Sequence, residues 1–405
     1  MLKLVSTLTR DEYPFAQLEE FAGNGEALEV AWPGLERARP RPGRHLWERF
    51  AEFLPFERMD ARASLGEGNT PLVEAGPRLA TFSGLERLWL KNETQNPTGS
   101  FKDRGSLTCV FMARERGEPT LATVSTGNMG HSIAAYAARS GLRALVFVPE
   151  FAPREKLLPM TLHGATVIKV RAPDYALMKQ TVLGLAGEFN LRIVSGNGPI
   201  RVEGYKLTAF ELYEQTRGEL PDYIAVPTSA CGHLRGLFKG FRELQAAGLI
   251  RRCPRMIVVQ AANNSPIVSA LKQGAEHVIP FANFHTVAEA ITSGNPMGGD
   301  EIIAKARAHG WLAEDVTEAE ILEAQRQLAA AGWFVEPAAA TTLGAVRKLR
   351  AAGRIAAGES VLLMLTGAGL KDLGVLEHQP FAVRESSLDA LRRDLARWFS
   401  DSSGR

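Results

Sequence analysis

The 405-residue chain has little cysteine, no long apolar run and almost no net charge. Its three cysteines, Cys109, Cys231 and Cys253, are far apart and odd in number. This pattern argues against a disulfide framework, favours a reducing compartment and offers no zinc-ligand spacing. No run approaches the roughly twenty apolar residues of a membrane-spanning helix, and the first residues lack the pattern of a signal peptide. We therefore expect a cytoplasmic protein that binds neither metal nor membrane.

The charges of the chain are balanced. Lysine and arginine number 47 and aspartate and glutamate 45, which gives a formal net charge of +2. This balance gives no indication of a nucleic-acid-binding protein, so basic groups in any site must act locally. Hydrophobic residues make up 45% of the sequence, as in globular enzymes, and the length suits two or three domains with sizeable cores.

Short apolar runs alternate with amphipathic stretches from about Leu88 onward. This alternation is typical of α/β proteins in which helices cover mostly parallel sheets. One set of predicted strands comprises 121–125, 144–148, 166–170 and 192–195, and another comprises 223–227, 256–260 and 360–366. Thr317 and Glu320 form a capping box that predicts the start of a helix.

Lys102 stands just after a Pro/Gly turn, Asn96–Ser100, where the apolar strand 88–90 gives way to a predicted helix. Backbone N–H groups and a positive helix end lower the pKa of an ammonium there, which favours condensation of the amine with an aldehyde cofactor as a Schiff base. The alternative is a surface lysine on an ordinary helix. The lysine motif alone does not decide between the two.

Three further motifs follow the lysine motif along the chain. Ser125–His131 reads STGNMGH, Ser229–His233 reads SACGH and Leu365–Asp372 reads LTGAGLKD. With the lysine motif, they resemble the threonine synthase family of pyridoxal phosphate (PLP) enzymes, from about Gly66 to about Asp372. The resemblance implies the fold type II plan, in which two domains each have a helix-covered, mostly parallel sheet and PLP lies in the cleft between them.

The resemblance also implies a division into domains. We expect residues 46–105 and 201–380 to form a large PLP-binding domain and residues 106–200 a small mobile domain. Residues 1–45 look like the zinc-ribbon hairpin of many threonine synthases, followed by a Pro/Arg-rich linker. Ser6 and Thr9 stand where the first cysteine pair would be, so a metal-free hairpin is expected, or else a plain N-terminal extension. Residues 381–405 are predicted to form an amphipathic helical tail that packs on the same or a neighbouring subunit, with a peripheral membrane helix as the alternative.

The resemblance assigns roles around the cofactor. Lys102 is the expected covalent link to PLP and, once displaced, the base for the substrate Cα proton. Asn128 is expected to hydrogen-bond the ring oxygen of PLP. Ser125, Thr126 and Met129 lie in the same turn, which is expected to bind the substrate and hold its carboxylate at a helix start. The simpler interpretation is helix capping by Ser125, Thr126 or Asn128.

Two more segments are expected to contact PLP. The resemblance assigns its phosphate to the loop of Ser229, Ala230, Cys231, Gly232 and His233, through backbone N–H groups. It places Thr366 opposite the pyridine nitrogen, where a neutral partner favours elimination or replacement chemistry over transamination. Cys231 is interpreted as a packing residue, and His233 as a phosphate-loop histidine rather than a catalytic one.

Arg201 resembles the arginine that meets the substrate phosphate in this family. Its guanidinium offers paired donors to a phosphate dianion. A salt bridge to Glu203 or Glu211 is the alternative.

Three departures from the family pattern change polar groups where the substrate should be recognised: Met129, the Ser229–His233 loop and Ala368. The leading hypothesis is a threonine synthase-like lyase, expected as a homodimer, that makes L-threonine and phosphate from O-phospho-L-homoserine and water. The alternatives are a related PLP enzyme of β-elimination or β-replacement and a PLP-holding protein without turnover.

Overall fold

The structure is a computed structural model of the whole chain. It describes residues 2–18, 20–31, 33–125, 127–150, 152–172, 175–189, 191–282, 285–376 and 383–400. The chain divides into two compact units, residues 1–372 and 373–405. The first unit contains the three sheets that the described residues form and all the candidate site residues.

The larger sheet has the strand order β11-β10-β9-β12-β5-β4. Its strands are β4 Leu72–Glu74, β5 Leu88–Asn92, β9 Tyr223–Pro227, β10 Arg255–Ala261, β11 Leu312–Val316 and β12 Val361–Leu365. Neighbouring strands are parallel except β4 with β5. Strands β9 and β12 are buried along their whole length, which explains their continuous apolar sequence. The lysine turn, the 229–233 loop and Thr366 all follow the carboxyl ends of these parallel strands.

The smaller sheet has the order β6-β7-β8 and is parallel. Its strands are β6 Thr120–Val124, β7 Arg143–Pro149 and β8 Thr166–Val170, at three of the four predicted places. The fourth predicted strand, 192–195, forms only a single bridge between Ile193 and Ala122. Beyond this bridge, the N–H of Ser195 donates to Glu20 Oε1, at 2.8 Å, rather than to a neighbouring strand.

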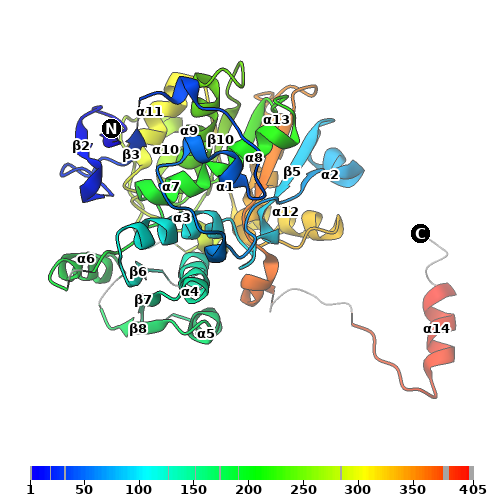
Figure 1. Ribbon diagram of the computed structural model, residues 1–405. Coiled ribbons are helices and arrows are strands. Elements are labelled where there is room, and N and C mark those ends of the chain that lie inside the picture. Colours follow the sequence, from blue (N-terminus) through cyan, green and yellow to red (C-terminus); the bar gives the residue numbers. More distant parts are fainter. Residues whose placement is uncertain are drawn as a thin grey trace. The chain divides into compact units, whose positions relative to one another are not determined.

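Helices pack on both sheets, and Figure 1 shows α4, α5 and α6 around the smaller one. The helices of the first unit are α1 Leu46–Arg49, α2 Gly76–Ser83, α3 Lys102–Glu115, α4 Asn128–Ser140, α5 Arg154–Leu162, α6 Tyr175–Ala186, α7 Pro199–Tyr205, α8 Leu207–Gln215, α9 Gly232–Ala246, α10 Pro266–Gln273, α11 Gly299–His309, α12 Glu318–Ala330 and α13 Pro337–Ala351. The capping box of Thr317 and Glu320 opens α12, as predicted.

Helix α3 contacts both α4 and α7, so it connects the surroundings of the two sheets. The approach of α3 to α7 depends on glycine. A Cβ at Gly204 would overlap the carbonyl oxygen of Arg104, and a Cβ at Gly105 would lie only 2.8 Å from the ring of Tyr205. The two helices therefore pack backbone against backbone.

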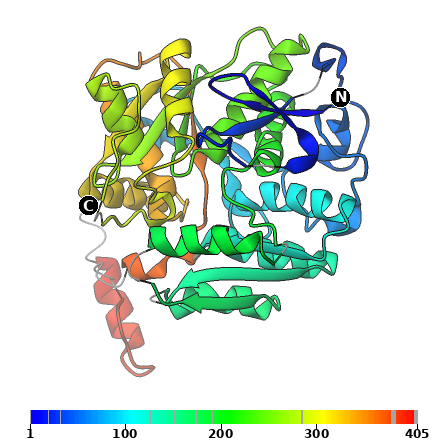
Figure 2. The ribbon, with the colours of Figure 1, turned by 90° about the vertical axis from the view of Figure 1, so that its left-hand side faces the viewer.

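The N-terminal residues form a third, antiparallel sheet in the order β2-β1-β3. Its strands are β1 Lys3–Ser6, β2 Glu12–Pro14 and β3 Leu28–Ala31, and β3 contacts α7 (Figure 2). The hydroxyls of Ser6 and Thr9 both donate to the carboxylate of Glu26. These hydrogen bonds tie Ser6 and Thr9, which stand where the first cysteine pair of a zinc ribbon would be, to Glu26. Among the described residues, His, Cys, Asp and Glu form no group of three or more suited to a metal ion.

The second unit contains α14, Leu391–Ser400, within the predicted helical tail. Leu388, Leu391 and Leu395 are exposed. Residues 381–382 and 401–405 of the predicted tail lie outside the described residues. In the described part of the chain, no helix combines the length and apolar character needed to cross a membrane.

Candidate active site

Lys102 is the first residue of α3, and the turn before it is held by hydrogen bonds. Gly99 has a φ of 75°, which suits glycine, and its N–H donates to the carbonyl of Asn96 at 2.8 Å. The Asp103 carboxylate accepts from the N–H and hydroxyl of Thr98 at 2.7 and 2.6 Å. These bonds fix the start of the helix and therefore the direction of the lysine.

The Lys102 amine lies beside aromatic rings. Its Nζ is 4.3 Å from the ring centre of Phe101 and 5.9 Å from that of Tyr205. Burial lowers the pKa of Lys102 to about 7. The positive charge of Arg201 adds to this lowering, and the negative charge of Glu336 opposes it. The pKa is thus lowered as expected, but its main cause is burial rather than the helix end. Around neutral pH, a large fraction of the amine is unprotonated and nucleophilic.

Asn128, at the start of α4, is bonded to Glu336. Its Nδ2 donates to Glu336 Oε2 at 2.9 Å, and the Glu336 N–H donates to the carbonyl of Gly367 at 3.0 Å. Burial raises the pKa of Glu336. Sequence reasoning missed this residue because it belongs to none of the four motifs. The Glu-Pro pair that opens α13 was the available signal.

Thr366 follows β12 directly beside the lysine turn. Its carbonyl accepts from the N–H of Phe101 at 3.1 Å, and the N–H of Ala368 donates to the carbonyl of Gly99 at 2.9 Å. Thr366 is buried. The structure therefore holds Lys102 and Thr366 on two hydrogen-bonded backbone segments.

The predicted phosphate loop, 229–233, connects β9 to α9. Helix α9 begins at Gly232, so its first N–H groups have no partner within the helix. A Cβ at Gly232 would overlap the carbonyl oxygen of Gly196, so this glycine permits two loops to touch. Cys231 has a φ of 73°, and burial raises the pKa of its thiol, which suits a packing residue and not a nucleophile.

His233 is buried against Phe101. Their ring centres are 4.0 Å apart and the rings are nearly parallel, at 17°. Both ring nitrogens lack a hydrogen-bond partner within the described residues. Burial lowers the pKa of His233 to about 3, so the imidazole is neutral. Buried polar atoms are normally satisfied, and a phosphate bound at this loop would provide an acceptor.

Arg201 is fully buried in α7, next to Lys102. Its Nη1 donates to the carbonyl of Lys102 at 3.4 Å and to the hydroxyls of Ser106 and Tyr205 at 3.4 and 3.3 Å. Its Nε and Nη2 have no hydrogen-bond partner in the part of the chain that the structure describes. The guanidinium therefore has donors left for a further acceptor.

The two carboxylates considered as partners of Arg201 form other ion pairs. These are Glu203 with Lys206 and Lys239, and Glu211 with Lys91 and Arg104. The alternative of a salt bridge from Arg201 to either carboxylate is therefore not what the structure shows.

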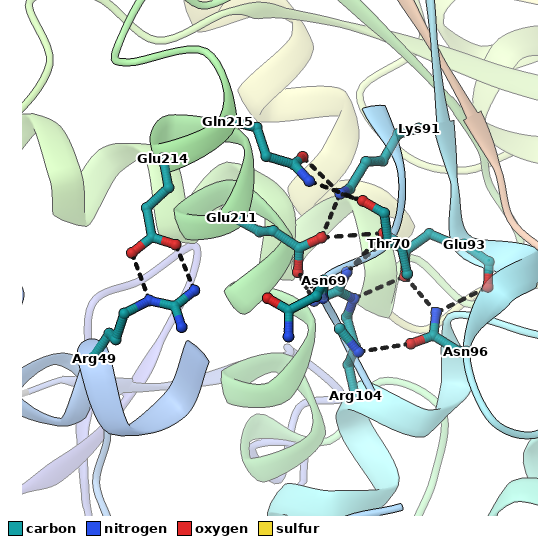
Figure 3. Close-up of polar contacts among 11 residues, drawn as sticks. Arg49, Asn69, Thr70, Lys91, Glu93, Asn96, Arg104, Glu211, Glu214 and Gln215 are labelled. Atoms are coloured by element: carbon teal, nitrogen blue, oxygen red, sulfur yellow. Dashed lines mark hydrogen bonds and ion pairs between the residues drawn. The ribbon is translucent and has the colours of Figure 1, made fainter. Parts of the chain in front are cut away.

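A buried ion cluster of Lys91, Glu93, Arg104 and Glu211 anchors the start of α3 (Figure 3). Arg104 Nε donates to Glu93 at 2.7 Å and its Nη1 to Glu211 at 2.9 Å, while Lys91 pairs with Glu211. Buried charges of this kind depend on their partners. Arg104 is two residues beyond Lys102, so the cluster also positions the lysine.

The turn before α4 has a capping hydroxyl. Ser125 Oγ accepts from the N–H groups of Gly127 and Gly130 at 3.4 and 3.2 Å. Thr126 lies outside the described residues. The Met129 sulfur approaches Gly196, where it would be 3.6 Å from a Cβ. Ser125 thus has the capping contacts considered from the sequence, while Asn128 is bonded to Glu336 instead.

Two motif residues without a predicted role meet beside the lysine turn. Lys371 Nζ donates to the carbonyl of Thr98 at 2.7 Å and lies 3.0 Å from Nδ1 of His131. Burial lowers the pKa of both side chains, that of His131 to about 4. These contacts connect α4 to the loop after β12.

Comparison with known proteins first defines the class. Residues 63–367 match the family described as pyridoxal-phosphate dependent enzyme. The fold is similar to that of serine racemase from Dictyostelium discoideum, with a TM-score of 0.62 and 23% identity over 74% of this chain and 92% of that one. It is also similar to the processed form of threonine deaminase isoform 2 from Solanum lycopersicum, with a TM-score of 0.65 and 18% identity over 89% and 90% of the two chains.

Closer sequence relatives define the family within this class. The chain is 39% identical over 327 residues to a threonine synthase of Methanocaldococcus jannaschii, covering 80% of each protein. It is 38% identical over 354 residues to a threonine synthase of Methanosarcina acetivorans, covering 86% of this chain and 85% of that one. The chain therefore belongs to the threonine synthase family of PLP-dependent lyases. The predicted α/β fold, family and cofactor are confirmed.

The residues present fit PLP. Lys102 provides an amine with a lowered pKa, and the start of α9 with the unpartnered His233 nitrogens provides a setting for a phosphate. Thr366, on the neighbouring backbone segment, provides a neutral group.

Proposed function

We propose that the protein makes L-threonine and phosphate from O-phospho-L-homoserine and water. Its threonine synthase relatives support the reaction. The structural observation that carries the proposal is Arg201, a buried guanidinium next to Lys102 with two nitrogens unpartnered among the described residues. This arrangement suits a substrate with an amine at one end and a phosphate at the other.

Lys102 is the proposed catalytic residue. PLP, when bound, delocalises the electrons left at the substrate Cα after proton loss. The lysine amine would hold the cofactor covalently and, once free, would remove the Cα proton. Its pKa of about 7 suits this second task, because a general base works best when its pKa is near the working pH.

Three further groups are proposed to hold the cofactor. The 229–233 loop and the first turn of α9 would donate backbone N–H groups to its phosphate. Asn128 would contact the ring oxygen, with Glu336 fixing the orientation of the amide. Thr366 would face the pyridine nitrogen and, being neutral, would not stabilise a charged ring. The turn at 125–129 would receive the substrate carboxylate.

Arg201 is the proposed phosphate-binding residue of the substrate site. Its Nη1 is tied to the carbonyl of Lys102 and to Tyr205, which fixes the plane of the guanidinium. A planar group held in this way can offer paired donors to a phosphate without losing further side-chain freedom.

A second candidate is an enzyme of β-elimination or β-replacement acting on an activated serine such as O-phosphoserine. Two apolar side chains favour it. Met129 approaches Gly196, and Ala368 lies beside Gly99 in the lysine turn. Polar groups at these positions would assist proton transfers at the substrate Cβ and Cγ, which only the longer substrate requires.

Phosphate release assayed separately with O-phospho-L-homoserine and O-phospho-L-serine distinguishes the two candidates. We expect turnover of the first with formation of threonine. Release from O-phosphoserine alone would exclude the proposed reaction and leave the second candidate.

We also propose that the enzyme is a cytoplasmic homodimer. Size-exclusion chromatography with light scattering tests the assembly, for which one chain of 44.1 kDa predicts a dimer near twice that mass.

A further inference from the structure

Glu20, which follows β2 in the N-terminal region, reaches the loop that leads into α7. Its Oε1 accepts from the backbone N–H of Ser195 at 2.8 Å, across 175 positions of sequence. A Cβ at Gly198 would overlap the Glu20 carboxylate, so the glycine lets the acid lie against the backbone. An acidic side chain of the N-terminal region thus lies against Gly198, which precedes Arg201 by three positions.

Glu20 and Arg201 line one cavity. Its other walls include Leu18, Cys109, Arg192 and Ile200. Arg192 pairs with Glu118, whereas Nε and Nη2 of Arg201 have no partner among the described residues. Burial raises the pKa of Glu20, and the positive charge of Arg201 opposes that rise. An anion bound at the guanidinium therefore also meets the field of a carboxylate.

We propose that Glu20 is a specificity-determining residue that weakens the binding of doubly charged anions at Arg201. The inference rests on the proposed function, since it takes Arg201 as the residue that binds the distal group of the substrate. A carboxylate near a poorly solvated binding site repels a bound anion and so weakens its binding. The repulsion is larger for a dianion than for a monoanion. Glu20 then limits how tightly the enzyme holds a phosphorylated substrate and the phosphate that it releases.

The competing explanation is that Glu20 only anchors the N-terminal region to Ser195. Glu20→Gln separates the two explanations, because the amide oxygen still accepts from the Ser195 N–H while the charge is removed. Glu12→Gln is the matched control, since Glu12 is an exposed carboxylate of the N-terminal sheet that pairs with Lys3. Glu20→Asp keeps the charge and serves as a second variant.

The experiment measures the binding of sulfate, phosphate and formate to the holoenzyme at pH 8 by calorimetry, with bound PLP occupying the cofactor phosphate site. Glu20→Gln is expected to lower the Kd of sulfate and phosphate about tenfold and that of formate much less. The KM of Glu20→Gln for O-phosphohomoserine should fall together with the Kd values of sulfate and phosphate. Glu12→Gln and Glu20→Asp should bind sulfate like the natural protein.

Sulfate binding that is unchanged or weaker in Glu20→Gln would overturn the inference and leave the role of Arg201 intact. Arg201→Gln tests that role separately and is expected to abolish sulfate binding. If Arg201→Gln binds sulfate as tightly as the natural protein, the anion site lies elsewhere, and the phosphate contact of the proposed function fails together with the inference.

Discussion

At the scale of single residues, the position of Lys102 at the start of a helix could be predicted from its sequence motif, but the main cause of its lowered pKa could not. A Pro/Gly turn between a strand and a helix is a local pattern. The rings and charges that alter the amine come from Phe101, Tyr205, Arg201 and Glu336, most of them distant in sequence. The positions of Glu336 and Glu20 near the site could not be predicted for the same reason, because contacts with residues distant in sequence place them there.

The lowered pKa of Lys102 predicts how PLP attachment depends on pH. The unprotonated amine is the nucleophile, so the rate of attachment to apoenzyme should rise between pH 6 and 8, around the pKa of about 7, and then level off. Rapid-mixing absorbance follows the reaction, and Lys102→Ala should lack the borohydride-reducible adduct. A midpoint near 10 would show that the lysine is solvated.

Arg201→Ala should weaken the binding of a phosphorylated substrate to the enzyme. Because a buried charge pair loses one partner, kcat/KM for O-phosphohomoserine should fall by about 2 to 4 kcal/mol in free-energy terms. PLP occupancy should change little, and Arg201→Lys should restore activity only partly, because an ammonium lacks paired donors. Steady-state kinetics with a cofactor titration measures both, and unaltered kinetics would remove Arg201 from the substrate site.

At the scale of elements, the strands and helices near the site could be predicted more completely than their partners. Helix α3 begins at Lys102 as expected, and β9, β10 and β12 lie where their apolar runs indicate. The segment 192–195 has a strand-like sequence, yet Ser195 bonds to Glu20 from another part of the chain. A pattern read locally cannot reveal such competition for a backbone N–H.

Helix packing leads to a prediction about glycine. Gly204→Ala should destabilise the protein by about 1 to 3 kcal/mol, because its methyl group would overlap the carbonyl of Arg104 and separate α7 from α3. Gly184→Ala in α6 is the control, since a Cβ there meets nothing within 4 Å. The free energy of unfolding of that variant should rise by roughly 0.5 to 1 kcal/mol, because alanine reduces the backbone freedom of the unfolded chain. Denaturant unfolding measures both, and equal effects would contradict the packing argument.

At the scale of the whole molecule, the buried ion cluster connects β5, α3 and α8. The family resemblance did not predict this cluster. Burial alone would raise the pKa of Glu93, but the charge and hydrogen bonds of Arg104 lower this pKa to about 2. A carboxylate with a lowered folded-state pKa stabilises the protein fully above its unfolded value near 4.5, and this contribution disappears as pH falls toward 2.

Glu93→Gln should therefore cost about 3 to 5 kcal/mol at pH 7, because it leaves Arg104 without its charged partner. The difference from the natural protein should shrink between pH 4.5 and 2. Unfolding free energies measured across this range test both the size and the sign, and a difference that grows on acidification would contradict the assignment. Glu323→Gln is the control and should change stability little, because Glu323 is a partly exposed carboxylate paired with the exposed Arg326.

The hydrogen bonds between the lysine turn and the segment after β12 have a mechanical consequence. Phe101 is tied to Thr366, and Ala368 to Gly99, so Lys102 and Thr366 belong to one stiff frame. Asn128 reaches that frame through a single side-chain contact with Glu336. Any rocking of α4 would therefore stretch the Asn128–Glu336 and His131–Lys371 contacts together, while backbone hydrogen bonds keep Lys102 and Thr366 at a fixed spacing. A spectroscopic label on α4 would register opening while the lysine kept its place.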